Sequence, residues 1–324
     1  MEQSAQEDSH NMRPVWTFLA SPFFLLVVAG FLFAAKVMVS KAALDAGVQP
    51  FQLGVIGNLG AGVVLFPWLL GSKTSLPCGP RHLLLYLLLG LISFALPVVL
   101  SHLVVARVGP AYGATIYCLS PLLTMTLAVA LRLEKAYFLR SFGIVLGFVG
   151  MIALVQQQLL QIDMSQHFWV ISGLAIPVCA ALGNIMRSAY WPRGTSALAF
   201  SCATLLVSSA MLGVAAPIFE SPANWHFADA SIALWLLAFI CVSAISYLAN
   251  FRLQELAGPV IFSQIGYWGT GFGILLAAAM FGDVLTTLSF MGMGCIVCGS
   301  ALARRRAPEE PALIQKSVYS KPRP

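Results

Sequence analysis

A lysine inside an apolar segment is the residue whose chemistry is easiest to interpret. Lys36 lies fourteen positions after Pro22, and therefore about 20 Å along a helix that begins there. A lysine near the middle of a bilayer costs about 2.5–3.5 kcal/mol on insertion scales, and such residues usually face a cavity or a pathway. There the ammonium group would attract a carboxylate or a phosphate. The alternative is that Lys36 extends toward the outer interface, where Lys41 also lies.

The corresponding segment in the second half of the chain carries two polar residues. Asn184 lies inside an apolar segment, where its amide would hydrogen-bond either a bound molecule or a neighbouring helix. The sequence favours neither role over the other. Arg187 lies closer to the end of the segment, which favours an interfacial anchor over a binding residue.

Aromatic and polar side chains gather on two further segments, 110–131 and 258–281. These candidates are Tyr117, Ser120, Gln264, Tyr267 and Trp268. Tyrosine and tryptophan rings offer an apolar face with a polar tip, which suits a small amphipathic molecule. Plain helix packing is the competing interpretation, and it has equal weight even for Gln264 and Tyr267.

Two acidic residues at segment ends, Glu134 and Asp283, are expected to be structural, pairing with nearby cations or helix N-termini. The acidic residues near the apolar segments all lie close to segment ends, so none is placed to act as a buried proton relay. Proton coupling stays open and would use His102 or one of these acids. No cofactor or metal is expected, because Cys295 and Cys298 form a CxxC pair without a nearby histidine.

The composition places these residues in a membrane. Hydrophobic residues make up 59% of the 324 and charged residues 9%, which excludes a soluble domain. The net charge of +6 does not indicate nucleic-acid binding, because the basic residues are scattered over loop ends and the tail. The expected partners are therefore the lipid bilayer and a small-molecule substrate. No GxxxxGK[ST] motif is present, so ATP does not power the protein directly.

Hydropathy predicts ten membrane-spanning helices. They cover residues 22–46, 51–71, 81–105, 110–131, 138–158, 168–190, 196–218, 231–254, 258–281 and 284–303. Two of them begin at Pro110 and Pro259, where the missing N–H of proline costs nothing. Fifteen lysines and arginines fall on the side of the N-terminus and three on the other, so both tails, 1–21 and 304–324, are expected to be cytoplasmic.

The chain also contains an internal duplication with a shift of 149 residues. Gly109-Pro110 recurs as Gly258-Pro259, and Glu134 recurs as Asp283. Because each copy holds five helices, the second copy, 168–303, must be inverted relative to the first, 22–158. Inverted repeats are typical of secondary transporters that work by alternating access. Glycine spacing within the helices favours packing inside one bundle over pairing of two chains, although a homodimer stays open.

Two stretches resemble the EamA-type branch of the drug/metabolite transporter superfamily. They are GPAYGATIYCLSPLLTMTLAVALRLEKAYFLRSFGIVLGFVGMIAL, from Gly109 to Leu154, and GPVIFSQIGYWGTGFGILLAAAMFGDVLTTLSFMGMGCIVCGSAL, from Gly258 to Leu302. Each has a proline-started helix, a terminal acid and a glycine-spaced closing helix. The resemblance covers residues 22–303 and implies an all-α integral membrane fold. It also implies that segments 110–131 and 258–281 line a central cavity.

The sequence thus favours a secondary exporter of a small amphipathic or amino-acid-like metabolite, located in a bacterial cytoplasmic membrane. An organic-anion or sugar-phosphate antiporter is the alternative, which Lys36 would suit. An integral-membrane enzyme is disfavoured, because its site needs clustered ionisable residues and the five histidines are dispersed. A channel is disfavoured by the absence of a ring of charges.

Overall fold

The chain folds into helices. A computed structural model describes residues 21–71, 77–108, 112, 116–159, 166–192, 194–220, 229–281 and 287–303, and no strand occurs in these ranges. In chain order the elements are α2 (Pro22–Asp45), α3 (Pro50–Gly71), α4 (Pro80–Leu89), η1 (Gly90–Ala95), α5 (Leu96–Arg107), η2 (Tyr117–Leu119), α7 (Ser120–Ala130), α8 (Phe138–Leu159), α9 (His167–Gly173), α10 (Ala175–Ala189), α11 (Ala197–Phe219), α12 (Ala230–Ser263), α13 (Ile265–Phe281) and α14 (Thr287–Ala303).

Local sequence signals explain where several helices begin. α2, α3 and α4 each start with proline, whose fixed φ suits the first turn and whose missing N–H has no helical partner there. Ser21 caps α2 by accepting a hydrogen bond from the backbone N–H of Phe24 at 3.2 Å. Ser196 caps α11 in the same way by accepting from the N–H of Ala199 at 3.2 Å.

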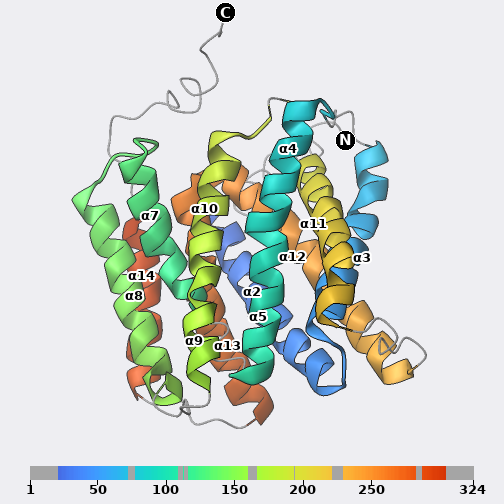
Figure 1. Ribbon diagram of the computed structural model, residues 1–324. Coiled ribbons are helices and arrows are strands. Elements are labelled where there is room, and N and C mark those ends of the chain that lie inside the picture. Colours follow the sequence, from blue (N-terminus) through green and yellow to red (C-terminus); the bar gives the residue numbers. More distant parts are fainter. Residues whose placement is uncertain are drawn as a thin grey trace, which may run out of the picture.

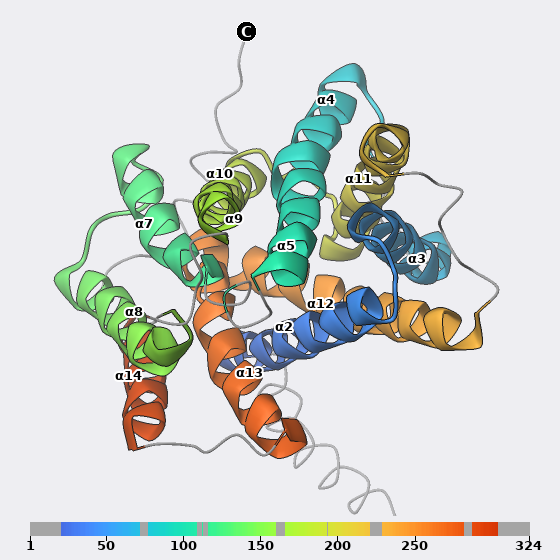
Figure 2. The same cartoon turned by 60° about the horizontal axis from the view of Figure 1, so that its bottom comes forward.

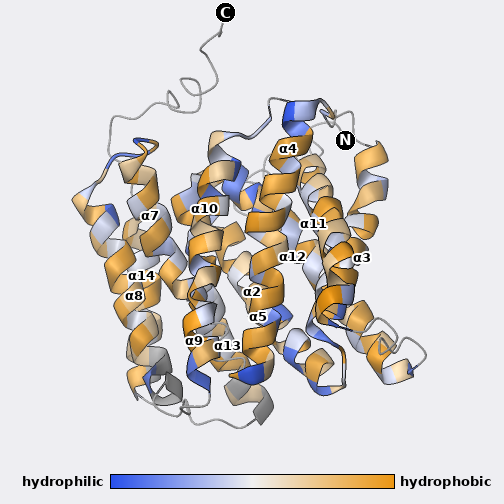
Figure 3. Ribbon diagram, in the orientation of Figure 1, coloured by the Kyte–Doolittle hydropathy of each residue, from blue (hydrophilic) through white to orange (hydrophobic). Residues whose placement is uncertain are grey.

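The helices have the length and surface expected of an integral membrane protein. Within the described ranges, six are long and apolar enough to cross a bilayer: Pro22–Asp45, Pro50–Gly71, Pro80–Arg107, His167–Ala189, Ala197–Phe219 and Ala230–Ser263. The shorter apolar helices are Tyr117–Ala130, Phe138–Ala153, Ile265–Leu276 and Phe290–Ala303. Large apolar side chains face outward, with Phe138 84% and Ile218 77% exposed. Figure 3 shows apolar residues along the helix sides and hydrophilic residues concentrated toward both ends of the bundle.

Helices from the two halves of the chain are interleaved (Figure 1). α8 packs most extensively on α14, α3 packs on α11, and α2 packs on α12 and α13. In Figure 2 the α8–α14 pair lies on one side of the bundle and the α3–α11 pair on the other, with α2, α12 and α13 between them. Each extensive contact thus joins an element of the first half to one of the second.

Glycines bring α8 and α14 into backbone contact. A Cβ at Gly143 would lie 2.5 Å from the carbonyl oxygen of Gly299, and one at Gly150 would lie 2.6 Å from that of Gly292. Any larger side chain would force the two helices apart. These glycines therefore allow close helix packing within the bundle, as their spacing indicates.

A carboxylate joins the ends of α11 and α3. Glu220 follows the last residue of α11 and accepts hydrogen bonds from the backbone N–H groups of Phe51, at 2.8 Å, and Gln52, at 3.2 Å. These N–H groups belong to the first turn of α3, where they have no helical partner. A negative charge at this position also interacts favourably with the positive end of the helix dipole.

The predicted helix 258–281 differs from the observed structure. The backbone of Gly258 is non-helical (φ 78°, ψ −178°), so it divides α12 into a long helix and a short helical segment that ends at Ser263. Glycine tolerates this positive φ, and Pro259 suits the first turn of the second segment because its missing N–H has no helical partner there. The helix is then interrupted at Gln264, and α13 begins at the next residue.

The predicted helix 110–131 is also interrupted. Its described part begins with the short 3-10 helix η2 and continues as α7 from Ser120. Tyr117 and Gly266, which are 149 residues apart, lie at these two interruptions, and the ideal Cβ of Gly266 would be 3.0 Å from the carbonyl oxygen of Tyr117. The two interruptions therefore meet inside the bundle, where irregular backbone is tolerated only if protein or a cavity surrounds it.

Candidate functional site

A cavity lies where the two interruptions meet, enclosed by α2, η1, α5, η2, α7, α10, α12 and α13. About 1100 Å³ of space free of protein atoms, part of it open to solvent, lies inside it. We call it the central cavity. Its charged and polar lining residues are Lys36, Ser40, Ser93, Ser101, His102, Tyr117, Ser120, Asn184, Arg187, Ser246, Tyr247, Asn250 and Ser263. Phe33, Phe94, Phe239, Phe251 and Phe262 supply its aromatic walls.

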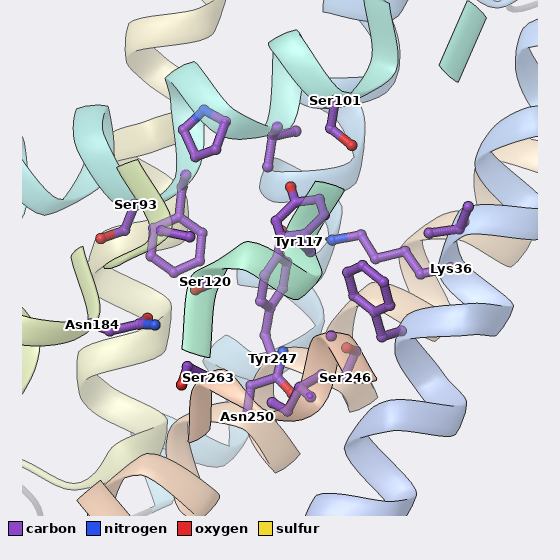
Figure 4. A pocket seen from close by; sticks show the side chains of 18 of the residues that line it. Lys36, Ser93, Ser101, Tyr117, Ser120, Asn184, Ser246, Tyr247, Asn250 and Ser263 are labelled. Carbon is purple, nitrogen blue, oxygen red and sulfur yellow. Dashed lines mark hydrogen bonds between the residues drawn. The ribbon is translucent and has the colours of Figure 1, made fainter. Parts of the chain in front are cut away.

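Lys36 points into the central cavity and not toward an interface (Figure 4). Its Nζ donates a hydrogen bond to the hydroxyl of Tyr247 at 2.7 Å and lies 4.1 Å from the centre of that ring. Tyr247 in turn donates to Oδ1 of Asn58 at 3.1 Å, and Nδ2 of Asn58 donates to Oγ of Ser208 at 3.0 Å. This network from α11, α3 and α12 fixes the position of the ammonium group.

Arg187 faces the same cavity from the second half of the chain. Its side chain is only 4% exposed, and its Cζ lies 4.9 Å from the ring centre of Phe251 and 5.1 Å from that of Phe262. Nη2 donates to Oδ1 of Asn184 at 3.1 Å, whereas Nε has no hydrogen-bond partner among the described residues. The guanidinium is thus held by aromatic faces and one amide.

The interfacial role that the sequence favoured for Arg187 is therefore wrong. The reason is the packing of α12 on α10, which places the rings of Phe251 and Phe262 against the Arg187 guanidinium. Gln254 of α12 donates to the carbonyl oxygen of Asn184 at 2.8 Å and to Oγ of Ser188 at 2.9 Å. This contact between two distant segments has no signal in the local sequence around Arg187.

The two cations have no acidic counterpart in the central cavity. No aspartate or glutamate is among its lining residues. The ion pairs found in the described ranges join Lys41 to Asp45, Arg140 to Glu134 and Arg252 to Glu255, all outside the cavity. The lining therefore combines two positive charges with hydroxyls, amides and aromatic rings, a surface that suits a negatively charged organic molecule.

The structure brings four of the candidate residues together. Lys36, Tyr117, Ser120 and Asn184 all line the central cavity (Figure 4). Asn184 also donates to Oγ1 of Thr124 at 3.3 Å, so it contacts a neighbouring helix as well. His102, the candidate for a proton relay, lines the cavity too and has its Nδ1 3.1 Å from the carbonyl oxygen of Pro50.

The other three candidates, Gln264, Tyr267 and Trp268, are not in the cavity lining. The hydroxyl of Tyr267 donates to the carbonyl oxygen of Ile144 on α8 at 3.0 Å, and Nε1 of Trp268 donates to Oγ of Ser300 on α14 at 3.1 Å. Gln264 is fully buried, and its amide has no partner in the described structure. Residues at these spacings share one helix face, and that face packs on α8 and α14 while Ser263 and Gly266 face the cavity.

The residues expected to be structural lie away from the cavity where they are described. Glu134 pairs with Arg140 at 2.7 Å, and a Cβ at Gly258 would lie 3.7 Å from its Oε1, so the carboxylate reaches the boundary between the two segments of α12. Pro259 follows that boundary. Pro110 and Asp283 lie outside the described residues.

Comparison with known families decides the class of protein. The sequence profile of the EamA-like transporter family matches residues 20–156. Over these residues, the chain is similar to members of the EamA-like transporter family. The resemblance inferred from the sequence motifs is thereby confirmed. The match indicates a membrane transporter of the drug/metabolite transporter superfamily.

A solved structure resembles this chain over most of its length. One of 29 matching chains, titled only "Crystal structure of protein", has a TM-score of 0.72 at 17% sequence identity. The alignment covers 87% of this chain and 98% of the other, and at this identity it shows the fold alone. No curated protein matches the sequence.

Proposed function

We propose that this EamA-like protein is a secondary transporter of small organic anions, with the central cavity as its substrate site. The observation that carries the proposal is the pair of cations, Lys36 and Arg187, in a cavity whose lining has no carboxylate. An amino acid would bring an ammonium group into this positive site without an acidic partner. The charges therefore favour the organic-anion alternative over the amino-acid-like substrate that the sequence placed first.

The architecture we propose is ten membrane helices in two inverted five-helix repeats, 22–158 and 168–303. Three observations support it: five expected helices per repeat, pairing of each half with the other, and interruptions in both duplicated helices. Interrupted helices at the midplane are typical of transporter binding sites. Rocking of the two repeats would expose Lys36 and Arg187 to each side of the membrane in turn.

We further propose that the protein lies in a bacterial cytoplasmic membrane and exports its substrate. The excess of basic residues on one side supports cytoplasmic tails, fifteen against three. The membrane potential, negative inside, changes the energy of one moving charge by about 2.3 kcal/mol per 100 mV. An anion carried with net negative charge is therefore driven outward.

The test is uptake of radiolabelled organic anions by liposomes that contain the purified protein. We expect uptake by the wild type and at least a tenfold lower kcat/KM in Lys36→Met and in Arg187→Met. Each substitution keeps an unbranched side chain and removes a charge from the bundle, so folding should be preserved.

Matched controls are Lys41→Met, on the same helix as Lys36, and Arg252→Met, on α12. Both residues pair with nearby acids outside the cavity. They should transport as the wild type does. An equal loss of kcat/KM in the control and cavity variants would contradict the proposed site. An absence of anion uptake by correctly folded wild-type protein would contradict the proposed function.

A further inference from the structure

The two cations of the central cavity occupy separate ends of it. Lys36 lies over the rings of Phe239 and Tyr247, whereas Arg187 lies over those of Phe94, Phe251 and Phe262. No ring and no hydrogen-bond partner is common to both. In Figure 4 Lys36 enters from one side and Asn184, the partner of Arg187, from the opposite side, with Tyr117 and Tyr247 between them.

Both cations keep hydrogen-bond donors that the described protein does not use. The Lys36 ammonium has three N–H groups and donates one described bond, to Tyr247. The Arg187 guanidinium has five and donates one, to Asn184, while its Nε is buried without a partner. An acidic group at either end would therefore meet unsatisfied donors of opposite charge, which form the strongest class of hydrogen bond.

The wall between these ends is aromatic. The rings of Phe94 and Tyr247 lie 5.5 Å apart, and each also contacts one of the two cations. Ser120 and Ser263 add hydroxyl groups to the lining. A short carbon chain would pack on the rings, with room for a hydroxyl substituent.

We propose that the substrate is a small organic dianion, with acidic groups at its two ends that bind Lys36 and Arg187 at the same time. Dicarboxylates have this chemistry. The inference rests on the proposed function and narrows it, because a monoanion would neutralise only one of the two cations. The spacer of the dianion lies along Phe94 and Tyr247.

The test compares diacids with monoacids of the same chain length. Isothermal titration of the purified, full-length protein would use succinate against butyrate and adipate against hexanoate. We expect at least one dianion to bind tenfold or more tightly than the matching monoanion. In Lys36→Met and in Arg187→Met this preference should fall to less than twofold, while monoanion binding at the remaining cation persists.

The outcomes separate this inference from the broader proposal. Equal affinity of the wild type for dianions and monoanions would overturn the dianion inference and leave anion transport standing. Loss of monoanion binding in both variants, to the same extent as dianion binding, would show that both cations hold one acidic group and would also overturn it. Binding of no anion of either kind would overturn the proposed function itself.

Discussion

Removal of a single hydroxyl, in Tyr247→Phe, tests whether the network around Lys36 is built to position its charge. The ring and its contact with Phe94 stay, but two hydrogen bonds are lost: one from Lys36 at 2.7 Å and one to Asn58 at 3.1 Å. Asn58 is buried, so its Oδ1 is left without this partner. An unsatisfied buried polar group costs about 1–3 kcal/mol, and we expect a loss of unfolding free energy of that size.

The effect on substrate binding should be smaller than that of removing the charge. A hydrogen bond to a charged group contributes about 1.5–3 kcal/mol, so Lys36→Met should weaken anion binding roughly tenfold to a hundredfold or somewhat more. Tyr247→Phe leaves the ammonium group in place but frees it to adopt other rotamers. We expect a loss of affinity of about tenfold or less, measured as Kd for the transported anion.

The double variant supplies the decisive comparison. If Tyr247 acts through Lys36, adding Tyr247→Phe to Lys36→Met should weaken anion binding by less than about twofold. Isothermal titration of the four proteins gives the coupling directly, and thermal unfolding in detergent gives the stability change. Fully additive losses of affinity would refute a positioning role and assign Tyr247 an independent contact with the substrate.

Three further predictions concern packing and the limits of the site. Gly143→Leu should force α8 away from α14 and reduce the monodisperse fraction in size-exclusion chromatography. Gly213→Leu, next to open space, should not reduce it. Equal monodisperse fractions for the two variants would contradict the packing argument. Glu220→Ala removes the cap on the first turn of α3 and should cost about 0.5–2 kcal/mol in thermal unfolding, and an unchanged Tm would count against it. Trp268→Phe loses the hydrogen bond to Ser300 and should lower stability with an unchanged KM for anions. A raised KM would show instead that Trp268 contributes to substrate binding.

Hydropathy and punctuation by proline predict the helical segments well because a bilayer imposes a fixed length on each helix. The observed helices follow the expected boundaries closely at Pro22, Pro50 and Phe138. Gly258 and Pro259 also mark a boundary, because the backbone at Gly258 is non-helical and a further helical segment follows it. Glycine and proline mark a change of direction in the sequence, but only the surrounding packing decides between a bend and a loop.

The candidate site is predictable in part. Lys36 stands out because it is a charge far from either end of an apolar segment, and that signal is local. Arg187 lies near the end of its segment, so its burial depends on α12, which is more than sixty residues away in sequence. For segment 258–281 the sequence identifies the polar helix but not the direction of its faces. It therefore gives equal weight to a cavity position and to helix packing for Tyr267, which packs on α8.

The most direct test of the central claim is an experimental structure of the full-length protein with a transported anion bound. We predict density for the anion in the central cavity, with one acidic group in hydrogen-bond contact with Nζ of Lys36 and the other with the guanidinium of Arg187. Density that contacts neither cation, or an anion bound outside the cavity while the cavity holds none, would contradict the account.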